Sequence, residues 1–227
     1  MSIIFVTGTG TDVGKTIATA ALALRITADG HRVIPVKPVQ TGVKDGDTDD
    51  GDIATVEKLT GLGGVEFHRY PDPLAPNLAA RRAGRPAPDL EELAEQIREL
   101  DAPDTVVLVE GAGGLLVHLT DSETCADLAR ELDAEVVVVT TLGLGSLNSA
   151  ALTVEATRAR GLKVLGLIGG SLPDDQDLAT SLNLSELPVV TGVPLWGTLP
   201  AGLGQDAAFA ETAHRYLPAG CWTGEKN

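Results

Sequence analysis

The segment "IIFVTGTGTDVGKT", residues 3–16, constrains the fold of this chain more than any other. Its first five residues are apolar or β-branched and predict a short buried strand, and the glycines and threonines after them predict a tight loop. A helical pattern then begins at Lys15 and continues to position 28. A strand, a glycine-rich loop and a helix in this order predict one βα unit of an α/β sheet, with a loop suited to holding a phosphate group.

The end of this loop carries the residues that phosphate binding needs. Backbone N–H groups and the helix N-terminus attract the anion, Lys15 reaches the terminal phosphates of a nucleotide, and the Thr16 hydroxyl holds magnesium. The usual pattern GxxxxGK[ST] would require glycine at Thr9, whereas Gly8 stands one residue earlier, so this loop is one residue longer. The nucleotide contacts expected here are Asp12, Val13, Gly14, Lys15, Thr16 and Ile17.

Further apolar, β-branched runs alternate with helical patterns along the chain. Short strands that are apolar on both faces are typical of a parallel sheet covered by helices on both sides. We therefore expect an α/β, single-domain P-loop NTPase-like fold over residues 1–217, with a mostly parallel sheet flanked by helices on both faces, and a flexible tail over 218–227. The Pro- and Arg-rich stretch 68–90 is expected to be irregular. The predicted strands are 3–7, 32–38, 105–111, 135–141, 163–170 and, more weakly, 193–200; the predicted helices are 15–28, 52–60, 89–100, 125–132, 147–160 and 207–216.

Composition limits the partners of such a fold. The chain has 32 acidic and 17 basic residues, a formal net charge of −15 that disfavours nucleic acid and anionic membranes as partners. No run approaches the roughly 18 uninterrupted apolar residues of a membrane span, and no basic leader precedes the first strand, so we expect a cytoplasmic protein that acts on a small molecule. Cys125 and Cys221 lie far apart and indicate neither a disulfide framework nor a zinc site.

Ligands of open α/β sheets bind beyond the carboxyl ends of the strands, so the residues that follow each strand are candidates for the site. Glu110 lies at the carboxyl end of the third predicted strand and precedes Gly111, Ala112 and Gly113, whose small side chains let backbone amides approach a phosphate. Asp52 begins a helix after an aspartate-rich run. Because magnesium prefers oxygen ligands, we expect Thr16, Asp52 and Glu110 to hold it. The other aspartates of the run, Asp45, Asp47, Asp49 and Asp50, are better explained as solvated loop charges.

The second predicted strand runs into "KPVQTG", which places Lys37 and Thr41 at the same rim. A lysine at the end of a buried strand is costly unless its ammonium finds an anion. Lys37 is therefore predicted to stabilise negative charge between a substrate and the γ-phosphate of the nucleotide.

The segments "GTGTDVGKT", "KPVQTG", "VEGAGG" and "LGLGSLN", in this order, resemble the dethiobiotin synthetases over essentially the full chain. That family shares the lengthened loop. The resemblance implies an ATP- and Mg²⁺-dependent closure of a cyclic urea: CO2 adds to one amine of 7,8-diaminononanoate, the carbamate attacks the γ-phosphate, and the second amine expels phosphate.

The resemblance also implies roles for individual residues. Lys15 and Lys37 would be catalytic, and Thr11, Lys37 and Thr41 would contact the substrate. The loop before the helix at 147–160 would bind the substrate carboxylate across a homodimer interface through Gly145, Leu147 and Asn148. Base contacts would come from Gly170, Ser171, Pro200, Ala201 and Gly202. Because the family has an asparagine where this chain has Gly170, we expect weak discrimination among nucleotide bases and acceptance of other nucleoside triphosphates.

Three other classes remain as alternatives. A partitioning or metal-delivery ATPase has the same loop type, but it typically carries a lysine early in the loop, and "GTGTDVGKT" has none before Lys15. An amidoligase normally adds a glutaminase domain, for which no chain remains. A pure nucleotide-binding module would leave Lys37 without a role.

Overall fold

The computed structural model describes residues 3–44 and 51–223. Seven strands form one sheet in the order β3-β2-β4-β1-β5-β6-β7, and every neighbouring pair is parallel. The expected α/β fold with a parallel sheet is therefore confirmed. The strands are β1 (Ile3–Gly8), β2 (Arg32–Thr41), β3 (Val65–Tyr70), β4 (Thr105–Gly114), β5 (Glu135–Thr140), β6 (Val164–Leu172) and β7 (Leu195–Pro200).

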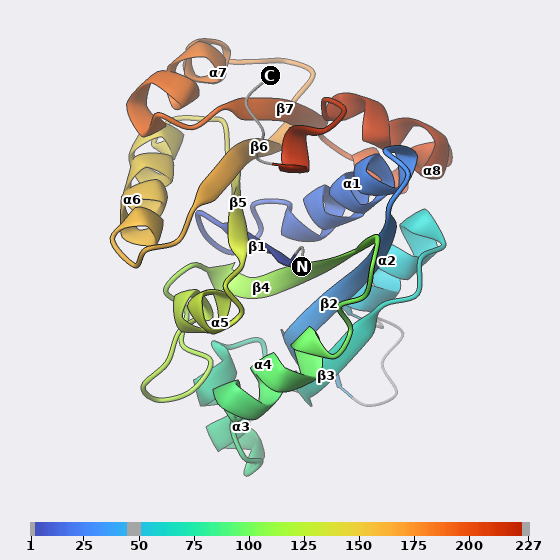
Figure 1. Ribbon diagram of the computed structural model, residues 1–227. Coiled ribbons are helices and arrows are strands. Elements are labelled where there is room, and N and C mark those ends of the chain that lie inside the picture. Colours follow the sequence, from blue (N-terminus) through green and yellow to red (C-terminus); the bar gives the residue numbers. More distant parts are fainter. Residues whose placement is uncertain (1–2, 45–50, 224–227) are drawn as a thin grey trace.

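Helices cover both faces of this sheet (Figure 1). Helices α1, α2 and α8 pack on one face, and α3 to α7 pack on the other. Among the described residues, no helix is long and apolar enough to cross a membrane. The helices are α1 (Lys15–Ala28), α2 (Asp52–Thr60), α3 (Pro76–Ala83), α4 (Leu90–Arg98), α5 (Cys125–Glu131), α6 (Ser146–Arg158), α7 (Leu178–Thr191) and α8 (Phe209–Thr212).

The central strands are buried on both faces, as their sequences predict. In β1, Ile3 and Phe5 belong to the core beneath α3 to α7, whereas Ile4 and Val6 belong to the core beneath α1 and α2. Successive side chains of a strand point to opposite faces, so a strand covered by helices on both sides is apolar at most of its positions. This burial fixes the carboxyl ends of β1, β2 and β4 at one edge, where the phosphate loop begins.

The helix predicted over 207–216 is shorter than expected, because α8 ends at Thr212 and a 3-10 helix follows over Ala213–Tyr216. Three further elements differ from the prediction. Strand β3 was not predicted because it lies at the edge of the sheet, where "VEFHRY" is mostly half-buried and lacks an apolar run. Helix α3 lies inside the stretch expected to be irregular, and its proline, Pro76, occupies the first helical position, where proline is tolerated. Helix α7 contains Pro188, a residue that argues against a helix in sequence.

The described part of the expected tail packs onto the body of the protein. Trp222 is buried, and its indole Nε1 donates a hydrogen bond to Asp29 Oδ2 at 2.9 Å. The backbone N–H of Gly220 donates to the same oxygen at 3.0 Å, and the ring of His31 lies edge-on to the Trp222 ring. Residues 218–223 therefore close the core beneath α1.

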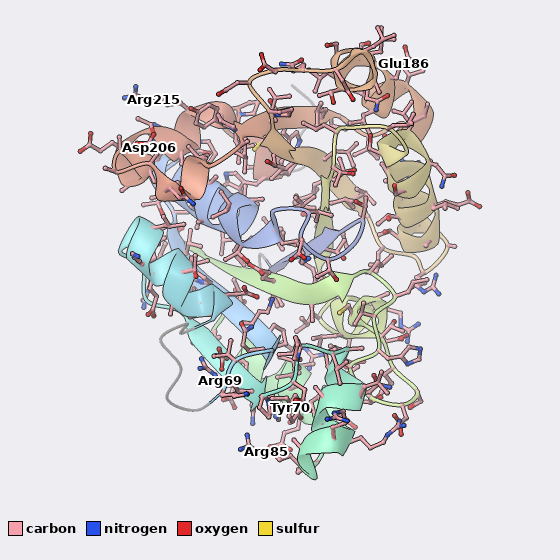
Figure 2. All side chains as sticks on the ribbon, turned by 180° about the vertical axis from the view of Figure 1, so that it is seen from behind. Arg69, Tyr70, Arg85, Glu186, Asp206 and Arg215 are labelled. Carbon is pink, nitrogen blue, oxygen red and sulfur yellow. The ribbon has the colours of Figure 1, made fainter. Side chains whose placement is uncertain are left out.

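The Pro- and Arg-rich stretch has a packing role. Tyr70 is buried, and its hydroxyl donates to the Pro86 carbonyl at 2.7 Å, while Arg85 donates to the Arg69 carbonyl at 3.1 Å. Figure 2 shows Arg69, Tyr70 and Arg85 together at the β3 and α3 end of the molecule. These contacts hold the loop between α3 and α4 against the end of strand β3.

Candidate active site

The loop between β1 and α1 is seated on strand β6. Gly14, the residue before α1, has φ +92°, and a Cβ atom there would lie 2.7 Å from the Gly170 carbonyl oxygen. A Cβ atom at Gly170 would overlap the Val13 carbonyl oxygen. Glycine is required at both positions because the two backbones touch, and Gly14 also needs a left-handed conformation.

Lys15 folds back over this loop. Its Nζ donates to the Gly10 carbonyl at 3.0 Å, which places the ammonium inside the curve of the loop. Burial lowers the pKa of Lys15, and the nearby charge of Lys37 lowers it further. An anion in the loop would reverse both effects, so the ammonium is set to bind phosphate oxygens.

Thr16 joins two carboxylates from distant parts of the chain. Its hydroxyl lies 3.1 Å from Asp52 Oδ1, at the first residue of α2, and 3.0 Å from Glu110 Oε1 in β4. Glu110 is only 1% exposed, and within the described residues its second oxygen, Oε2, has no hydrogen-bond partner. Burial raises the pKa of Glu110, and the charge of Asp52 adds to this effect against the opposing charge of Lys37.

This donor set fits magnesium. In the part of the chain that the structure describes, no group of three or more His, Cys, Asp or Glu side chains is gathered for a metal. Two carboxylates and a hydroxyl are instead the small oxygen set with which proteins hold Mg²⁺ together with nucleotide phosphates. The unpartnered oxygen of Glu110 is a buried acceptor that a cation would satisfy.

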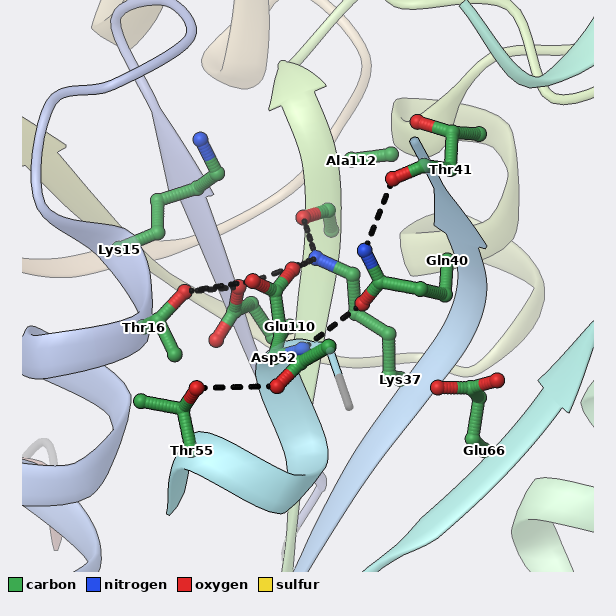
Figure 3. Close-up of polar contacts among 12 residues, drawn as sticks. Lys15, Thr16, Lys37, Gln40, Thr41, Asp52, Thr55, Glu66, Glu110 and Ala112 are labelled. Carbon is green, nitrogen blue, oxygen red and sulfur yellow. Dashed lines mark hydrogen bonds and ion pairs between the residues drawn. The ribbon is translucent and has the colours of Figure 1, made fainter. Parts of the chain in front are cut away.

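Lys37 lies between the same two carboxylates (Figure 3). Its Nζ is 2.5 Å from Asp52 Oδ2 and 3.0 Å from Glu110 Oε1, and it donates to the Gly111 carbonyl at 3.1 Å. Lys37 is 3% exposed; burial alone would lower its pKa, but the charges of Glu110 and Asp52 outweigh burial and raise it. The two carboxylates therefore favour the charged form of Lys37.

The structure corrects where two of these residues lie along their strands. Strand β2 continues to Thr41 and β4 continues to Gly114, so Lys37 and Glu110 are inside their strands rather than at the ends. The side chains of Lys37 and Glu110 thus reach the site from within the sheet. Asp52 reaches the same site from the start of α2, and Lys37 lowers the pKa of the Asp52 carboxyl although burial would raise it.

A cavity of about 1080 Å³ opens beside this cluster. Part of its wall is apolar and comes from Val39, Val43, Val117 and residues 73–76. Twelve of the predicted site residues line it: Thr11, Asp12, Gly14, Lys15, Thr16, Ile17, Lys37, Thr41, Asp52, Glu110, Ala112 and Gly113.

The other predicted residues lie elsewhere. Val13 and Gly111 are buried behind the cavity wall, and Asp45, Asp47, Asp49 and Asp50 lie outside the described residues. Gly170 and Ser171 belong to β6, and Ala201 donates its backbone N–H to Leu172 at the end of that strand at 2.8 Å. The expected base contacts at 170–171 and 200–202 therefore share one edge. Gly145, Leu147 and Asn148 form the start of α6, away from the residues that line this cavity.

The sequence alone assigns no role to two residues of this region, Gln40 and Asn183. Gln40 lines the cavity and bonds to the backbone of Asp52; it stands in a quoted motif, but it was given no role. Asn183 on α7 donates from Nδ2 to the Leu142 and Gly143 carbonyls, both at 2.9 Å, and holds the loop before α6. Helix α7 was not predicted, so no signal placed Asn183 beside that loop.

Comparison with known proteins decides the family. A protein-family model described as an AAA domain matches residues 2–202. An ATP-dependent dethiobiotin synthetase of Corynebacterium diphtheriae is 62% identical over 205 residues, which cover 90% of this chain and 91% of that protein. The chain belongs to the dethiobiotin synthetase family. The synthetase of Saccharopolyspora erythraea is 53% identical over 219 residues and covers 96% of both chains.

Solved structures support the fold. The septum site-determining protein MinD from Pyrococcus horikoshii, in complex with Mg-ADP, superposes with a TM-score of 0.57 at 19% identity, covering 99% of this chain and 90% of MinD. The signal recognition particle receptor FtsY from Elizabethkingia anophelis gives a TM-score of 0.53 at 17% identity, over 98% of this chain and 64% of FtsY. At such identities the likeness concerns the fold alone, whereas the synthetases match in sequence.

Proposed function

We propose that this synthetase closes the ureido ring of dethiobiotin from 7,8-diaminononanoate and CO2, converting ATP to ADP and phosphate. The observation that carries this proposal is Lys37, a buried ammonium held between Asp52 and Glu110 beside the phosphate loop. A site that only binds and releases nucleotide has no use for a second buried lysine at this point. We place the activity in the cytoplasm, where ATP is supplied.

The substrate supplies its own nucleophiles. One amine attacks CO2 and loses a proton to give a carbamate, whose oxygen then attacks the γ-phosphorus as ADP leaves. The second amine attacks the carbonyl carbon of the resulting carbamic-phosphoric anhydride, expels phosphate and closes the ring. Of the described residues that line the cavity, none is cysteine, serine or histidine, which agrees with a protein that contributes positioning and charge rather than a covalent intermediate.

The two lysines have different places in this reaction. Lys15, inside the curve of the loop, binds the terminal phosphates and remains with ADP. Lys37, on the cavity side, neutralises charge on the transferring phosphoryl group and on the carbamate oxygen that attacks it. Thr11 and Thr41 line the cavity and orient the two amines.

Mg²⁺ would be held by Thr16, Asp52 and Glu110. It supplies positive charge to the phosphate oxygens when it is bound. The hydrogen bonds that Thr16 makes with both carboxylates keep these three groups within reach of one another.

We propose a homodimer that completes the substrate site. The apolar part of the cavity wall, residues 73–76 with Val39 and Val117, suits the aliphatic chain of the substrate. Gly145, Leu147 and Asn148 of a second copy would bind the substrate carboxylate, because the N-terminus of α6 attracts anions. Exposed apolar side chains of this loop, of α6 and of α7 offer the dimer surface: Leu144, Leu152, Leu178, Leu182, Val189 and Val190.

A phosphate-release assay tests the reaction. Release from ATP should require both diaminononanoate and bicarbonate, and mass spectrometry should detect dethiobiotin. Release that is independent of diaminononanoate would favour the alternative of a partner-driven ATPase and contradict the synthetase.

Subunit mixing tests the dimer. Lys37→Ala and Asn148→Ala chains, each inactive alone, should regain activity when mixed under conditions of subunit exchange. A monomer in sedimentation experiments at assay concentration would refute the shared site.

A further inference from the structure

Gln40 joins the candidate metal site to the candidate substrate site. It lies in β2 and is 6% exposed. Its Oε1 accepts a hydrogen bond from the backbone N–H of Asp52 at 2.9 Å, and its Nε2 donates to the Thr41 carbonyl at 2.9 Å (Figure 3). One side-chain amide thus satisfies the backbone donor at the start of α2 and a backbone acceptor at the end of β2.

The contact to Asp52 takes the place of a helix cap. Helix α2 begins at Asp52, and the residue before it, Gly51, has no side chain with which to cap the first N–H groups. Gln40 provides the missing acceptor from a neighbouring strand. A Cβ atom at Gly51 would lie 3.0 Å from Gln40 Oε1, and Gly51 has φ +90°, so glycine is needed there for the amide to reach the helix.

Asp52, whose backbone Gln40 holds, is also the residue whose carboxylate contacts Lys37 and Thr16. A shift in the first turn of α2 would move both Asp52 oxygens away from these partners together. The amide is suited to the task because it accepts and donates at once; a carboxylate lacks the donor, and an aliphatic side chain lacks both groups.

We propose that Gln40 is a positioning residue for this reaction: it fixes the start of α2 so that Asp52 presents its carboxylate to the Mg²⁺–nucleotide complex. The proposal rests on the proposed function of the site. Residues that orient a metal ligand without touching the metal typically change metal affinity or activity by roughly 10- to 100-fold when they are replaced.

The test uses Gln40→Leu, Gln40→Glu and the control Gln96→Leu. Gln96 on α4 is half-buried, its amide donates to Glu92 at 3.2 Å, and it is not among the residues that line the cavity. Binding of Mn²⁺ is measured by electron paramagnetic resonance with a non-hydrolysable ATP analogue present, so the readout does not depend on turnover or on diaminononanoate. Mg²⁺ dependence of phosphate release and thermal unfolding in EDTA are measured in parallel.

Gln40→Leu should weaken Mn²⁺ binding about tenfold or more and shift the half-saturating Mg²⁺ concentration to the same extent, while kcat at saturating Mg²⁺ stays within a few-fold of wild type. Gln40→Glu keeps the acceptor for Asp52 and should lie between wild type and Gln40→Leu. Gln96→Leu should change nothing.

Unchanged Mn²⁺ affinity in Gln40→Leu would overturn the proposal, including where its unfolding temperature falls, because Gln40 would then act on stability alone. Wild-type protein that binds Mn²⁺ and the analogue but forms no dethiobiotin would contradict the proposed function and leave the Gln40 comparison intact.

Discussion

Replacing Lys37 with alanine tests the division of labour between the two lysines. The change removes an ammonium that lies 2.5 Å from Asp52, 3.0 Å from Glu110 and 3.1 Å from the Gly111 carbonyl. Lys15 stays in the phosphate loop, where its Nζ contacts Gly10. We therefore expect Lys37→Ala to lose turnover while nucleotide still binds, and Lys15→Ala to lose both.

Lys37→Ala is expected to have two separate effects, one on turnover and one on the stability of the fold. Loss of one contact to transition-state charge costs about 3 kcal/mol, which is on the order of a hundredfold in kcat. The variant also leaves the carboxylate of Glu110, 1% exposed, beside Asp52 without a cation, and breaking a buried pair in this way destabilises a protein by about 3–5 kcal/mol. Protonation of Glu110, whose pKa is already raised by burial, would relieve part of the second effect.

The assay compares kcat for phosphate release, calorimetric ADP binding and urea unfolding in Lys37→Ala, Lys15→Ala and Lys163→Ala. Lys163 is the matched control because it pairs with Glu135 at the surface, 2.5 Å away, where removal of an ion pair costs under about 1 kcal/mol. Turnover within a few-fold of wild type in Lys37→Ala would refute the assigned role. So would an equal loss of ADP binding in folded Lys37→Ala protein, since Lys37 would then act on the nucleotide as Lys15 does.

Further outcomes follow from other contacts. Asn183→Leu, which removes the hydrogen bonds to the loop before α6, should raise KM for diaminononanoate roughly tenfold, equal to about 1.4 kcal/mol, with KM for ATP unchanged; equal changes in both would contradict this role. Asp29→Asn should cost about 1–3 kcal/mol in unfolding experiments at pH 7. Burial would raise the pKa of Asp29, but hydrogen bonds from Gly220, Trp222 and Arg25 lower it, so its contribution is present above about pH 4 and is lost as the pH falls through the lowered pKa; a wild-type advantage that persists at pH 2 would refute this. Values of kcat/KM for ATP, GTP and CTP should agree within about tenfold, because no side-chain amide stands at Gly170 to read a base. A hundredfold preference for ATP would contradict this interpretation of Gly170.

The parts predicted from sequence are those that depend on local pattern. Apolar β-branched runs identified six of the seven strands, since the central strands are buried on both faces and are therefore mostly apolar. Motif spacing brought Lys15, Thr16, Lys37, Asp52 and Glu110 to one rim, and the structure places all five beside one cavity. Their roles remain predictions.

What could not be predicted depends on contacts between distant segments. The half-buried edge strand β3 gains its order from pairing with β2, and its own residues give no apolar signal. In the sequence, Gln40 is one polar residue near a strand end, and only its hydrogen bond to the first residue of α2 distinguishes it. Asn183 likewise contacts the loop before α6 only because α7 packs against that loop. Propensity and periodicity describe one segment at a time, whereas these residues act across two.

The resemblance implies an asparagine in the family at the position of Gly170, and the structure connects this glycine to the way the loop between β1 and α1 is seated. A Cβ atom at Gly170 would overlap the Val13 carbonyl and lie 3.0 Å from the side chain of Val139, and a Cβ atom at Gly14 would press on the Gly170 carbonyl. Backbone is a costly neighbour to move, so an asparagine at position 170 could not be introduced without displacing the loop that holds Lys15. The same backbone contact therefore leaves no side chain at position 170, on the edge that β6 shares with residues 200–202. Selectivity for the base must then come from the backbone groups of residues 170–171 and 200–202, while the triphosphate keeps the contacts of the loop.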